Sequence, residues 1–512
     1  MTAAAAPAPN PAQAGRNPWL IAGAMILPTF MVALDTSVAN VALPRMAASL
    51  SATAHETTAV LTGYLVANAI MLPATGWLAQ HFGRKRFLIA NIVLFTLASI
   101  VCGAAWSLPV MVLARVLQGA SGGALLPVAQ AVVLESFPAG MRGEAMAAYG
   151  LGVIVAPIIG PTLGGWITDS YSWRWLFYIN VPVGVVAVVL AQMLIEDPPY
   201  IRNAARRGID YFGFLAMAIG LGSLQILLDS GQRHQWFASA WIRGAAMISV
   251  LTLGTFLLWE RRARQPVVDL TVLRDRNFGF GFIMAGVYGF ILYASLVMLP
   301  LFLQGLMGHS ALHTGLAITP RGLGALVSMV LAGRLIRRLD GRILIVLGFL
   351  MLGGGSFLLA QLTLASPITA VVAPNLIMGA AMGFIFVPMT TMAVASLPLD
   401  KIGTATGLYN LMRNMGGSVG IAITTTLLAR GAERHQGTLV SQLGASPHAA
   451  DVYHHLVQQA AMLSFVDSYY VLAALAMVGI PLGLMLRRPA RTVTETSPAE
   501  KQEQAMAATI AD

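Results

Sequence analysis

Residues 19–42, WLIAGAMILPTFMVALDTSVANVA, form an apolar run that contains a single charged residue, Asp35. A helix that crosses a membrane needs about 20 apolar residues, and this run is long enough. A charge at the centre of a bilayer costs about 2.5–3.5 kcal/mol on insertion scales. Asp35 is therefore expected to face a cavity or a polar partner instead of lipid.

The composition of the whole chain agrees with this first run. Of 512 residues, 57% are hydrophobic and only 10% are charged, whereas a soluble domain carries about 25% charged residues. The formal net charge is +10, but the basic residues form short clusters between apolar runs, which argues against a nucleic-acid surface. Cys102 is the only cysteine, so the chain has no disulfide framework. Much of the surface of this protein must therefore face lipid instead of water.

Apolar runs of spanning length recur along the chain and predict fourteen membrane helices. The predicted spans are 19–42, 57–80, 87–106, 109–134, 143–167, 174–195, 211–229, 239–259, 278–303, 312–336, 342–363, 369–396, 403–429 and 465–486. Because the number is even, both termini are expected on the same side of the membrane.

The distribution of Lys and Arg assigns that side. Of the 31 basic residues, 22 fall in the tails and the loops on the side of the termini, and 6 fall in the opposite loops. Loops rich in Lys and Arg stay in the cytoplasm. The sequence therefore predicts a multi-pass inner-membrane protein with both termini in the cytoplasm.

A basic turn occurs twice, and it indicates an internal repeat. Gly76–Lys85 (GWLAQHFGRK) follows the second span, and Gly333–Arg342 (GRLIRRLDGR) follows the tenth. The fold class expected is an all-α membrane protein with two six-helix bundles and two additional central helices, and such repeats place a substrate site at their interface.

The predicted boundaries are a disordered cytoplasmic tail over 1–17, the N-terminal bundle over 18–196, two inserted helices with linkers over 197–276, the C-terminal bundle over 277–488 with a periplasmic loop over 430–464, and a second disordered tail over 489–512. Residues 449–463 of that loop could form a short amphipathic helix that contacts a periplasmic partner, and an ordinary surface loop is the alternative.

Asp35 and Arg115 are the residues most suited to proton coupling. Asp35 is the only acidic residue well inside a span, and a low-dielectric environment favours the neutral form of a carboxyl group. Arg115 lies within the fourth span and cannot lose its charge, so it can fix a carboxylate or bind an anionic group. For Asp35 the alternative is a structural hydrogen bond to Asn40 or to a neighbouring helix, and for Arg115 it is a structural tie between helix ends.

The fifth span carries a stripe of small residues. The stripe consists of Ala148, Gly152, Ala156, Gly160 and Gly164 at intervals of four. Small residues let two membrane helices approach closely, and Pro157 and Pro161 beside them bend a helix or free its carbonyl groups. The pattern suits a helix that slides or rocks against a partner, and static close packing is the alternative.

A hydrolase pattern also occurs, at Gly119–Gly123 (GASGG), which fits G-x-S-x-G. That motif requires a strand–turn–helix context or a histidine on a nearby helix, and all nine histidines fall in loops or at the edges of spans. Gly119 and Gly123 are better explained as a packing face. The sequence contains no Walker loop, dinucleotide fingerprint or metal-ligand cluster, so we expect no enzymatic activity, no metal and no cofactor, with the proton gradient as the source of energy.

These motifs together resemble the major facilitator superfamily, and most of all its fourteen-helix drug:proton antiporters of the EmrB/QacA type. The resemblance covers residues 18–488. It rests on motifs in the order of the family: Leu34–Pro44, Gly76–Lys85, Arg115–Gly119, Pro157–Gly165, Trp173–Pro182, Leu228–Gln232, Glu260–Leu270, Pro300–Gln304 and Gly407–Gly416. Two positions depart from the pattern, since Gln80 replaces the acidic residue of the loop motif and Ala156 replaces the first glycine of the helix-five motif.

The resemblance implies proton-coupled efflux of hydrophobic or amphipathic small molecules by alternating access, with antibiotic resistance as a consequence. It implies proton coupling by Asp35 and Arg115. The residues expected to line the substrate cavity are Asn40, Gln118, Gln304, Arg321, Asn410 and Arg413. The residues expected to pack or move during the conformational change are Gly76, Gly83, Arg84, Gly152, Ala156, Pro157, Gly160, Pro161, Gly164 and Gly165. Members of this family from Gram-negative bacteria often work with a periplasmic adaptor and an outer-membrane channel, and a transporter of a specific metabolite or nutrient is the alternative function.

Overall fold

The computed structural model describes residues 17–202, 208, 210–263, 265–443 and 449–487. The side chains of Asn40 and Pro161 are outside this description, as are the two tails apart from Asn17. Within the described residues the chain is helical and contains no strand. The all-α prediction is confirmed for this part of the chain.

The N-terminal bundle is built from helices that follow the first six predicted spans. They are α1 (Pro18–Ser49), α2 (Ala54–Phe82), α3 (Arg84–Ala104), α4 (Leu108–Ser136), α5 (Arg142–Ser170) and a broken sixth helix made of α6 (Trp175–Tyr178) and α7 (Asn180–Leu194). Polar residues fix several starts: Asn17 accepts a hydrogen bond from the backbone of Trp19, and Thr53 forms a capping box with Glu56.

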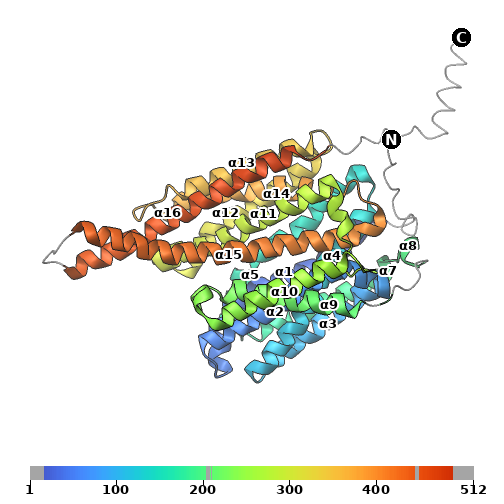
Figure 1. Cartoon of the computed structure of the whole chain (residues 1–512), viewed down its shortest axis with the longest axis horizontal. Coiled ribbons are helices and arrows are strands. Elements are labelled where there is room, and N and C mark those ends of the chain that lie inside the picture. The colour runs from blue at the N-terminus through green and yellow to red at the C-terminus, as the bar shows by residue number, and fades with distance from the viewer. Residues whose placement is uncertain (1–16, 203–207, 209, 264, 444–448, 488–512) are drawn as a thin grey trace, which may run out of the picture.

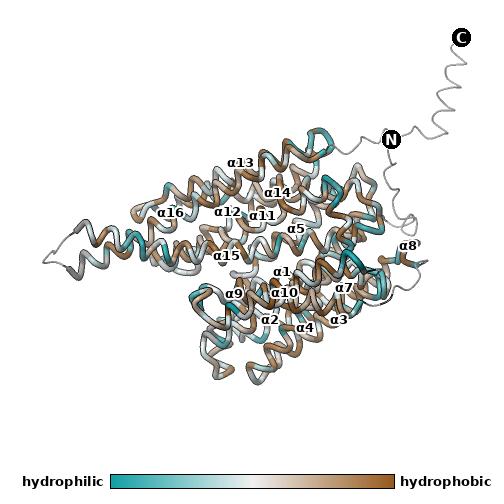
Figure 2. The backbone as a smooth tube through the Cα atoms, in the orientation of Figure 1, coloured by the Kyte–Doolittle hydropathy of each residue, from teal (hydrophilic) through white to brown (hydrophobic). Residues whose placement is uncertain are grey.

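The C-terminal bundle lies beside the first and is drawn in yellow to red in Figure 1. It contains α11 (Arg276–Pro300), α12 (Ala311–Leu335), α13 (Gly341–Leu359), α14 (Val372–Ala393), α15 (Leu399–Leu443) and α16 (Ala449–Leu484). Figure 2 shows hydrophobic residues through the body of both bundles and hydrophilic residues gathered at their ends and along the projecting part of α15 and α16.

Two further helices, α9 (Tyr211–Ser230) and α10 (Ala240–Glu260), pack on each other and connect the bundles. Gln225 of α9 exchanges hydrogen bonds with Ser418 of α15, and the indole of Trp236 donates to Thr426 at 2.9 Å. On the other side α9 packs against α2. The inserted pair therefore contacts both halves of the molecule, and the short helix α8 (Pro199–Arg202) precedes it.

Each of the fourteen predicted spans coincides with a helical segment, but not all are equally apolar. Twelve described segments are long and apolar enough to cross a membrane. The other two are α5 and α15. Helix α15 carries Asn410, Arg413 and Asn414 inside the molecule, and these residues lower its hydropathy. A multi-pass membrane fold is established, and the number fourteen stays a prediction.

The predicted loop over 430–464 is wrong, because the structure continues the helices through most of it. Helix α15 runs on to Leu443 and α16 begins at Ala449, and the two project together beyond the bundles (Figure 1). His435 contacts Asp467 at 2.8 Å and Gln436 donates to the phenol oxygen of Tyr453 at 2.7 Å. These polar contacts join the two helices, so a polar composition here does not indicate a loop.

The two bundles contact each other near the basic loops. Arg337, just after α12, forms an ion pair with Glu144 of α5 at 2.7 Å, and Gln80 of α2 donates to the backbone oxygen of Asp400 in α15 at 2.8 Å. Further along α15, Thr406 donates to the backbone oxygen of Pro127 in α4. The end of the molecule that carries the basic loops is therefore held closed by contacts between the bundles.

Candidate proton-coupling site

The Asp35 carboxylate lies in the interior of the N-terminal bundle. With a rise of 1.5 Å per residue, it is about 25 Å from the start of α1 and about 21 Å from its end. Its Oδ2 atom is 2.5 Å from Nη1 of Arg115, and both side chains are fully buried. Sequence positions 80 residues apart thus form a buried ion pair.

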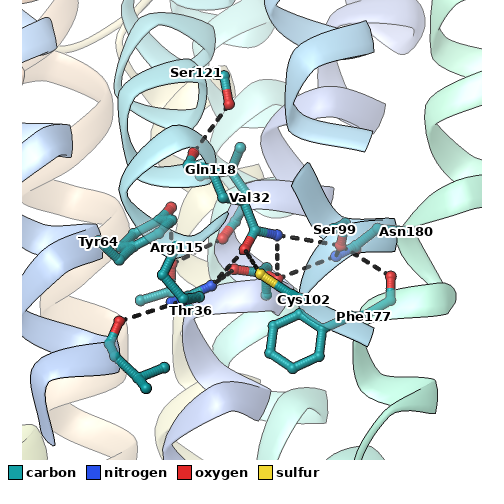
Figure 3. A network of polar contacts seen from close by, with 12 residues as sticks. Val32, Thr36, Tyr64, Ser99, Cys102, Arg115, Gln118, Ser121, Phe177 and Asn180 are labelled. Carbon is teal, nitrogen blue, oxygen red and sulfur yellow. Dashed lines mark hydrogen bonds and ion pairs between the residues drawn. The ribbon is translucent and has the colours of Figure 1, made fainter. Parts of the chain in front are cut away.

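Two amide side chains complete the environment of the carboxylate. Gln118 donates to Oδ1 of Asp35 at 2.8 Å and Asn180 donates to the same atom at 3.1 Å. Both amides also donate to Ser99 Oγ, which in turn donates to the backbone oxygen of Phe177 at 2.9 Å. Figure 3 shows this network, to which α1, α3, α4, α6 and α7 contribute.

The Arg115 guanidinium is fixed by more than its ion pair. Its Nη1 atom also donates to Gln118 Oε1 at 2.8 Å, and its Cζ atom lies 4.2 Å from the centre of the Tyr64 ring. An arginine on an aromatic face gains a cation–π attraction, which is stronger away from water. Tyr64 in turn accepts a hydrogen bond from Thr36, one residue after the acid. The guanidinium is thus held in a single place by α1, α2 and α4.

The contacts determine which protonation state this arrangement fits. Arg115, Gln118 and Asn180 all donate to Asp35, so the arrangement suits an ionised carboxylate. A proton bound at Asp35 would remove the charge that balances Arg115, and an uncompensated buried charge is strongly destabilising. Protonation of Asp35 must therefore rearrange the network. A proton-driven transporter requires such a link between the charge of one residue and the packing of its helices.

The small stripe of α5 packs against α1, the helix that carries Asp35. A Cβ atom on Gly152 would meet Ile26, one on Gly160 would lie 2.6 Å from Ser37 Cβ, and one on Gly164 would lie 3.3 Å from Val38 Cβ. Ala156 is fully buried, so alanine keeps the stripe closed at the position where the family has glycine. Ser37 also donates to the backbone oxygen of Pro157 at 3.4 Å.

The basic-turn glycines lie at two equivalent seams between the bundles. A Cβ atom on Gly76 of α2 would lie 2.6 Å from the backbone nitrogen of Thr404 in α15, and one on Gly333 of α12 would lie 2.8 Å from Ala147 Cβ in α5. Gly83 has a φ of +86°, which favours glycine at the end of α2. The next residue, Arg84, forms a buried ion pair with Glu135 at 2.5 Å and donates to Tyr200 in α8.

The residues proposed for a substrate cavity do not lie together. Gln118 belongs to the Asp35 network, Asn410 donates to Gln130 of the other bundle at 2.7 Å, and Gln304 is exposed on a π-helical turn after α11. Arg321 and Arg413 are buried in the C-terminal bundle. Asn40 lies on α1, and its side chain is outside the described residues.

The packing explanation of the G-x-S-x-G pattern agrees with the structure. Ser121 donates to the backbone oxygens of Leu117 and Gln118, within its own helix. A Cβ atom on Gly123 would lie 2.6 Å from the backbone oxygen of Asn68, and one on Gly119 would clash with the backbone of Tyr64. Both glycines therefore serve the close approach of α4 to α2.

Sequence reasoning missed Ser99, Asn180 and Tyr64. Asn180 lies in the Trp173–Pro182 motif, so an amide inside a span was available as a signal. Ser99 and Tyr64 carry no such signal, because hydroxyl residues are common in membrane helices and most of them bond to their own backbone.

Comparison with known proteins agrees with this architecture. The family model "Major Facilitator Superfamily" matches residues 25–421. The chain is 34% identical over 466 residues to the "Multidrug export protein EmrB" of Haemophilus influenzae, covering 91% of each protein, and 35% identical over 435 residues to the protein of that name from Escherichia coli, covering 85% of each. The crystal structure of the human organic anion transporter MFSD10 (TETRAN) has a TM-score of 0.62 at 11% identity and covers 91% of this chain and 100% of that one, which supports the fold alone.

The fold and the buried ion pair define a membrane transporter of the major facilitator class. The chain belongs to the Major Facilitator Superfamily, and its similarity to the EmrB exporters extends over most of its length.

Proposed function

We propose that the chain is a proton-driven exporter of hydrophobic or amphipathic small molecules, located in the inner membrane with both termini in the cytoplasm. The observation that carries the proposal is the fully buried Asp35–Arg115 pair inside a twin-bundle membrane fold. The similarity to two multidrug export proteins supports the direction and the breadth of transport. The energy is sufficient, since one charge crossing 100 mV supplies about 2.3 kcal/mol and one pH unit adds about 1.4 kcal/mol.

The proposed cycle starts from the state described above. With the basic loops in the cytoplasm, the contacts of Gln80 and Arg337 close the cytoplasmic side. A proton arriving from the outer side neutralises Asp35 and releases Arg115 from its ion pair. The change in the network then alters the packing of α1 on the small stripe of α5. Because α5 also packs against α12 of the other bundle, this movement reaches the seam that must open for substrate to enter from the cytoplasm.

The test uses membrane vesicles turned inside out, with an acidic interior imposed by a pH jump. The probe is the dye that the chain exports best in cells stripped of their own pumps. The wild-type protein is expected to accumulate the dye inside the vesicles, and Asp35→Asn is expected to abolish this accumulation. An uncoupler should collapse the wild-type signal. Accumulation by Asp35→Asn at the wild-type rate would refute the coupling role, and proton-driven movement in the opposite direction would identify a symporter.

The projecting ends of α15 and α16 are the proposed contact for a periplasmic adaptor. Their surface is polar and includes the pairs His435–Asp467 and Gln436–Tyr453. Removal of residues 436–460, with a short Gly-Ser linker in their place, is expected to leave transport in vesicles intact. The same deletion should lower drug resistance in intact cells if an adaptor binds there.

A further inference from the structure

The C-terminal bundle contains two buried arginines that have no carboxylate partner among the described residues. Arg321 on α12 is 4% exposed and Arg413 on α15 is 7% exposed. One nitrogen of Arg321, Nη2, donates to Ser295 Oγ at 2.8 Å and to Met378 Sδ at 3.3 Å. Its Nε and Nη1 atoms, and Nε of Arg413, have no hydrogen-bond partner among the described residues.

Tyrosines surround both guanidinium groups. Tyr288 on α11 lies within electrostatic range of Arg321 and of Arg413. Tyr469 lies close to Arg321 and Tyr409 lies close to Arg413. The hydroxyl groups of Tyr409 and Tyr469 are buried and also have no hydrogen-bond partner in the described part of the chain. The cluster therefore combines two permanent positive charges with unsatisfied donors from three helices, α12, α15 and α16.

Nearby carboxylates do not balance these charges. The described carboxylates of this bundle are these: Asp275 and Asp340 cap α11 and α13, Asp400 lies in the first turn of α15, Glu433 lies late in α15, and Asp467 contacts His435; none forms an ion pair with Arg321 or Arg413. Arginine cannot lose its proton in a protein, and a buried charge without a partner is strongly unfavourable. An anion that reached these side chains would balance a buried positive charge.

We propose that Arg321 and Arg413, with the hydroxyls of Tyr409 and Tyr469, form a binding site for a single monovalent anionic group. The group is either the carboxylate head of an amphipathic acid that the protein exports or a small free anion such as chloride. A planar guanidinium and phenol hydroxyls both donate to carboxylate oxygens with good geometry. As a statement about an exported substrate, this inference rests on the proposed function, whereas anion binding itself does not.

The position of Arg413 connects this site with the interface between the bundles. Arg413 lies within electrostatic range of Tyr149 on α5 of the N-terminal bundle. On the same helix, Asn410 donates to Gln130 and Asn414 donates to Asn68, both in the N-terminal bundle. An anion held at Arg413 is therefore next to the surface along which the two bundles move.

The test compares three ligands with the same twelve-carbon chain and different heads. Dodecanoate, dodecanol and dodecylammonium are titrated against the full-length protein in lipid nanodiscs, in gluconate buffer, with intrinsic tryptophan fluorescence as the readout. The wild-type protein is expected to bind dodecanoate at least about tenfold more tightly than the other two, since each tenfold corresponds to about 1.4 kcal/mol. Arg321→Gln and Arg413→Gln should each remove this preference and leave the binding of dodecanol unchanged.

Matched variants keep the result interpretable. Arg430→Gln changes an exposed arginine on the same helix as Arg413 and should retain the preference. Tyr469→Phe removes one unsatisfied hydroxyl with little change of shape, and it should weaken dodecanoate binding about threefold even if an arginine variant fails to fold. Equal binding of the three ligands by the wild type, or an unchanged preference in both arginine variants, overturns the proposal.

A parallel measurement with chloride shows whether the site binds a free anion or only the head group of an amphipathic acid. If chloride raises the unfolding temperature of the wild type but not of Arg321→Gln, and also displaces dodecanoate, the site accepts free anions. If chloride has neither effect, the site is specific for the head of an amphipathic acid. These binding measurements need no proton gradient. A protein that fails to transport dye would refute the proposed function without affecting them, and loss of the carboxylate preference would refute the anion site in a protein that still exports dye.

Discussion

The two bundles treat their buried charges in opposite ways. In the N-terminal bundle, Asp35 and Arg115 neutralise each other and share hydrogen bonds with Gln118 and Asn180. In the C-terminal bundle, Arg321 has no acidic partner and keeps two nitrogens without hydrogen bonds to the described residues. The N-terminal arginine is therefore neutralised inside the protein, although its Nη2 atom also has no hydrogen-bond partner among the described residues. An arginine without a counterion is suited to a partner that arrives from outside.

This difference predicts opposite roles for similar residue types. Arg115, Arg321 and Arg413 are permanent cations inside predicted spans, and sequence alone does not distinguish them. Under the proposed function Arg115 holds the carboxylate that takes up the proton, and under the proposed anion site Arg321 and Arg413 bind a ligand. One half of the molecule then senses the proton and the other half the cargo, and the seams α2–α15 and α5–α12 connect them.

The largest effect is expected from breaking the buried pair in the N-terminal bundle. Arg115→Gln leaves the Asp35 charge uncompensated, and loss of one partner of a buried pair costs about 3–5 kcal/mol. Asp35→Asn should cost a similar amount, because Arg115 then lacks its counterion. Thermal unfolding of the purified protein measures both losses.

The double variant Asp35→Asn/Arg115→Gln is the control for that pair. It removes both charges together and should be more stable than either single variant, although it cannot couple transport to protons. If each single variant unfolds within about 1 kcal/mol of the wild type, the pair behaves like an exposed one and the contrast between the bundles disappears.

A smaller loss is expected from filling the stripe that packs on α1. Gly160→Leu places a large side chain against Ser37, whose Cβ lies 2.6 Å from the position of the new Cβ, and overpacking costs about 1–3 kcal/mol. Dye transport should fall together with stability, because α1 carries the coupling acid. Gly165→Leu is the matched control, since nothing lies within 4 Å of its Cβ position. Equal effects of the two variants would show that the stripe is not a tight interface.

The prediction for the C-terminal bundle has the opposite sign. Arg321→Met removes a buried charge that has no counterion, so in gluconate buffer the stability should rise by about 1–2 kcal/mol. The same substitution should abolish any stabilisation by dodecanoate, which the wild type is expected to show. Loss of stability in gluconate would mean that the contacts with Ser295 and Met378 already satisfy Arg321, and the comparison of the two bundles would fail.

The sequence predicted the helices, and it singled out the two charged residues that form the buried ion pair, better than it predicted the surroundings of that pair. Apolar length alone determines a span, so the helices were readable, and single charges in apolar runs identified Asp35 and Arg115. Their contact depends on the packing of α1 against α4, which no local pattern encodes. Gln118 follows Arg115 by three positions and so shares its helix face. Of the residues around the ion pair, it was therefore the easiest to predict from sequence.

Other features were out of reach for physical reasons. Whether an embedded arginine has a partner depends on all the helices around it, so the contrast between Arg115 and Arg321 appears only in three dimensions. The predicted loop over 430–464 failed because polar composition was taken as the end of a helix. A helix can continue through a polar stretch when a second helix supplies contacts such as His435–Asp467.

The smallest effect is expected at the seams that join the bundles. The ion pair Arg337–Glu144 is partly exposed, with side chains 56% and 23% accessible, and such pairs contribute about 0.2–1 kcal/mol. Glu144→Gln should therefore leave unfolding almost unchanged. It should nevertheless shift the balance between open and closed forms by up to about fivefold, because 1 kcal/mol corresponds to that factor. Spin-label distances between the basic-loop ends of α5 and α12 measure this balance, and the exchange Glu144→Arg/Arg337→Glu should restore it.

At the equivalent seam, Gln80 bonds to a backbone oxygen and carries no charge, so high salt should open the α5–α12 seam and leave α2–α15 unaffected. If salt acted on both seams alike, the difference between a charged and an uncharged contact would not control the opening.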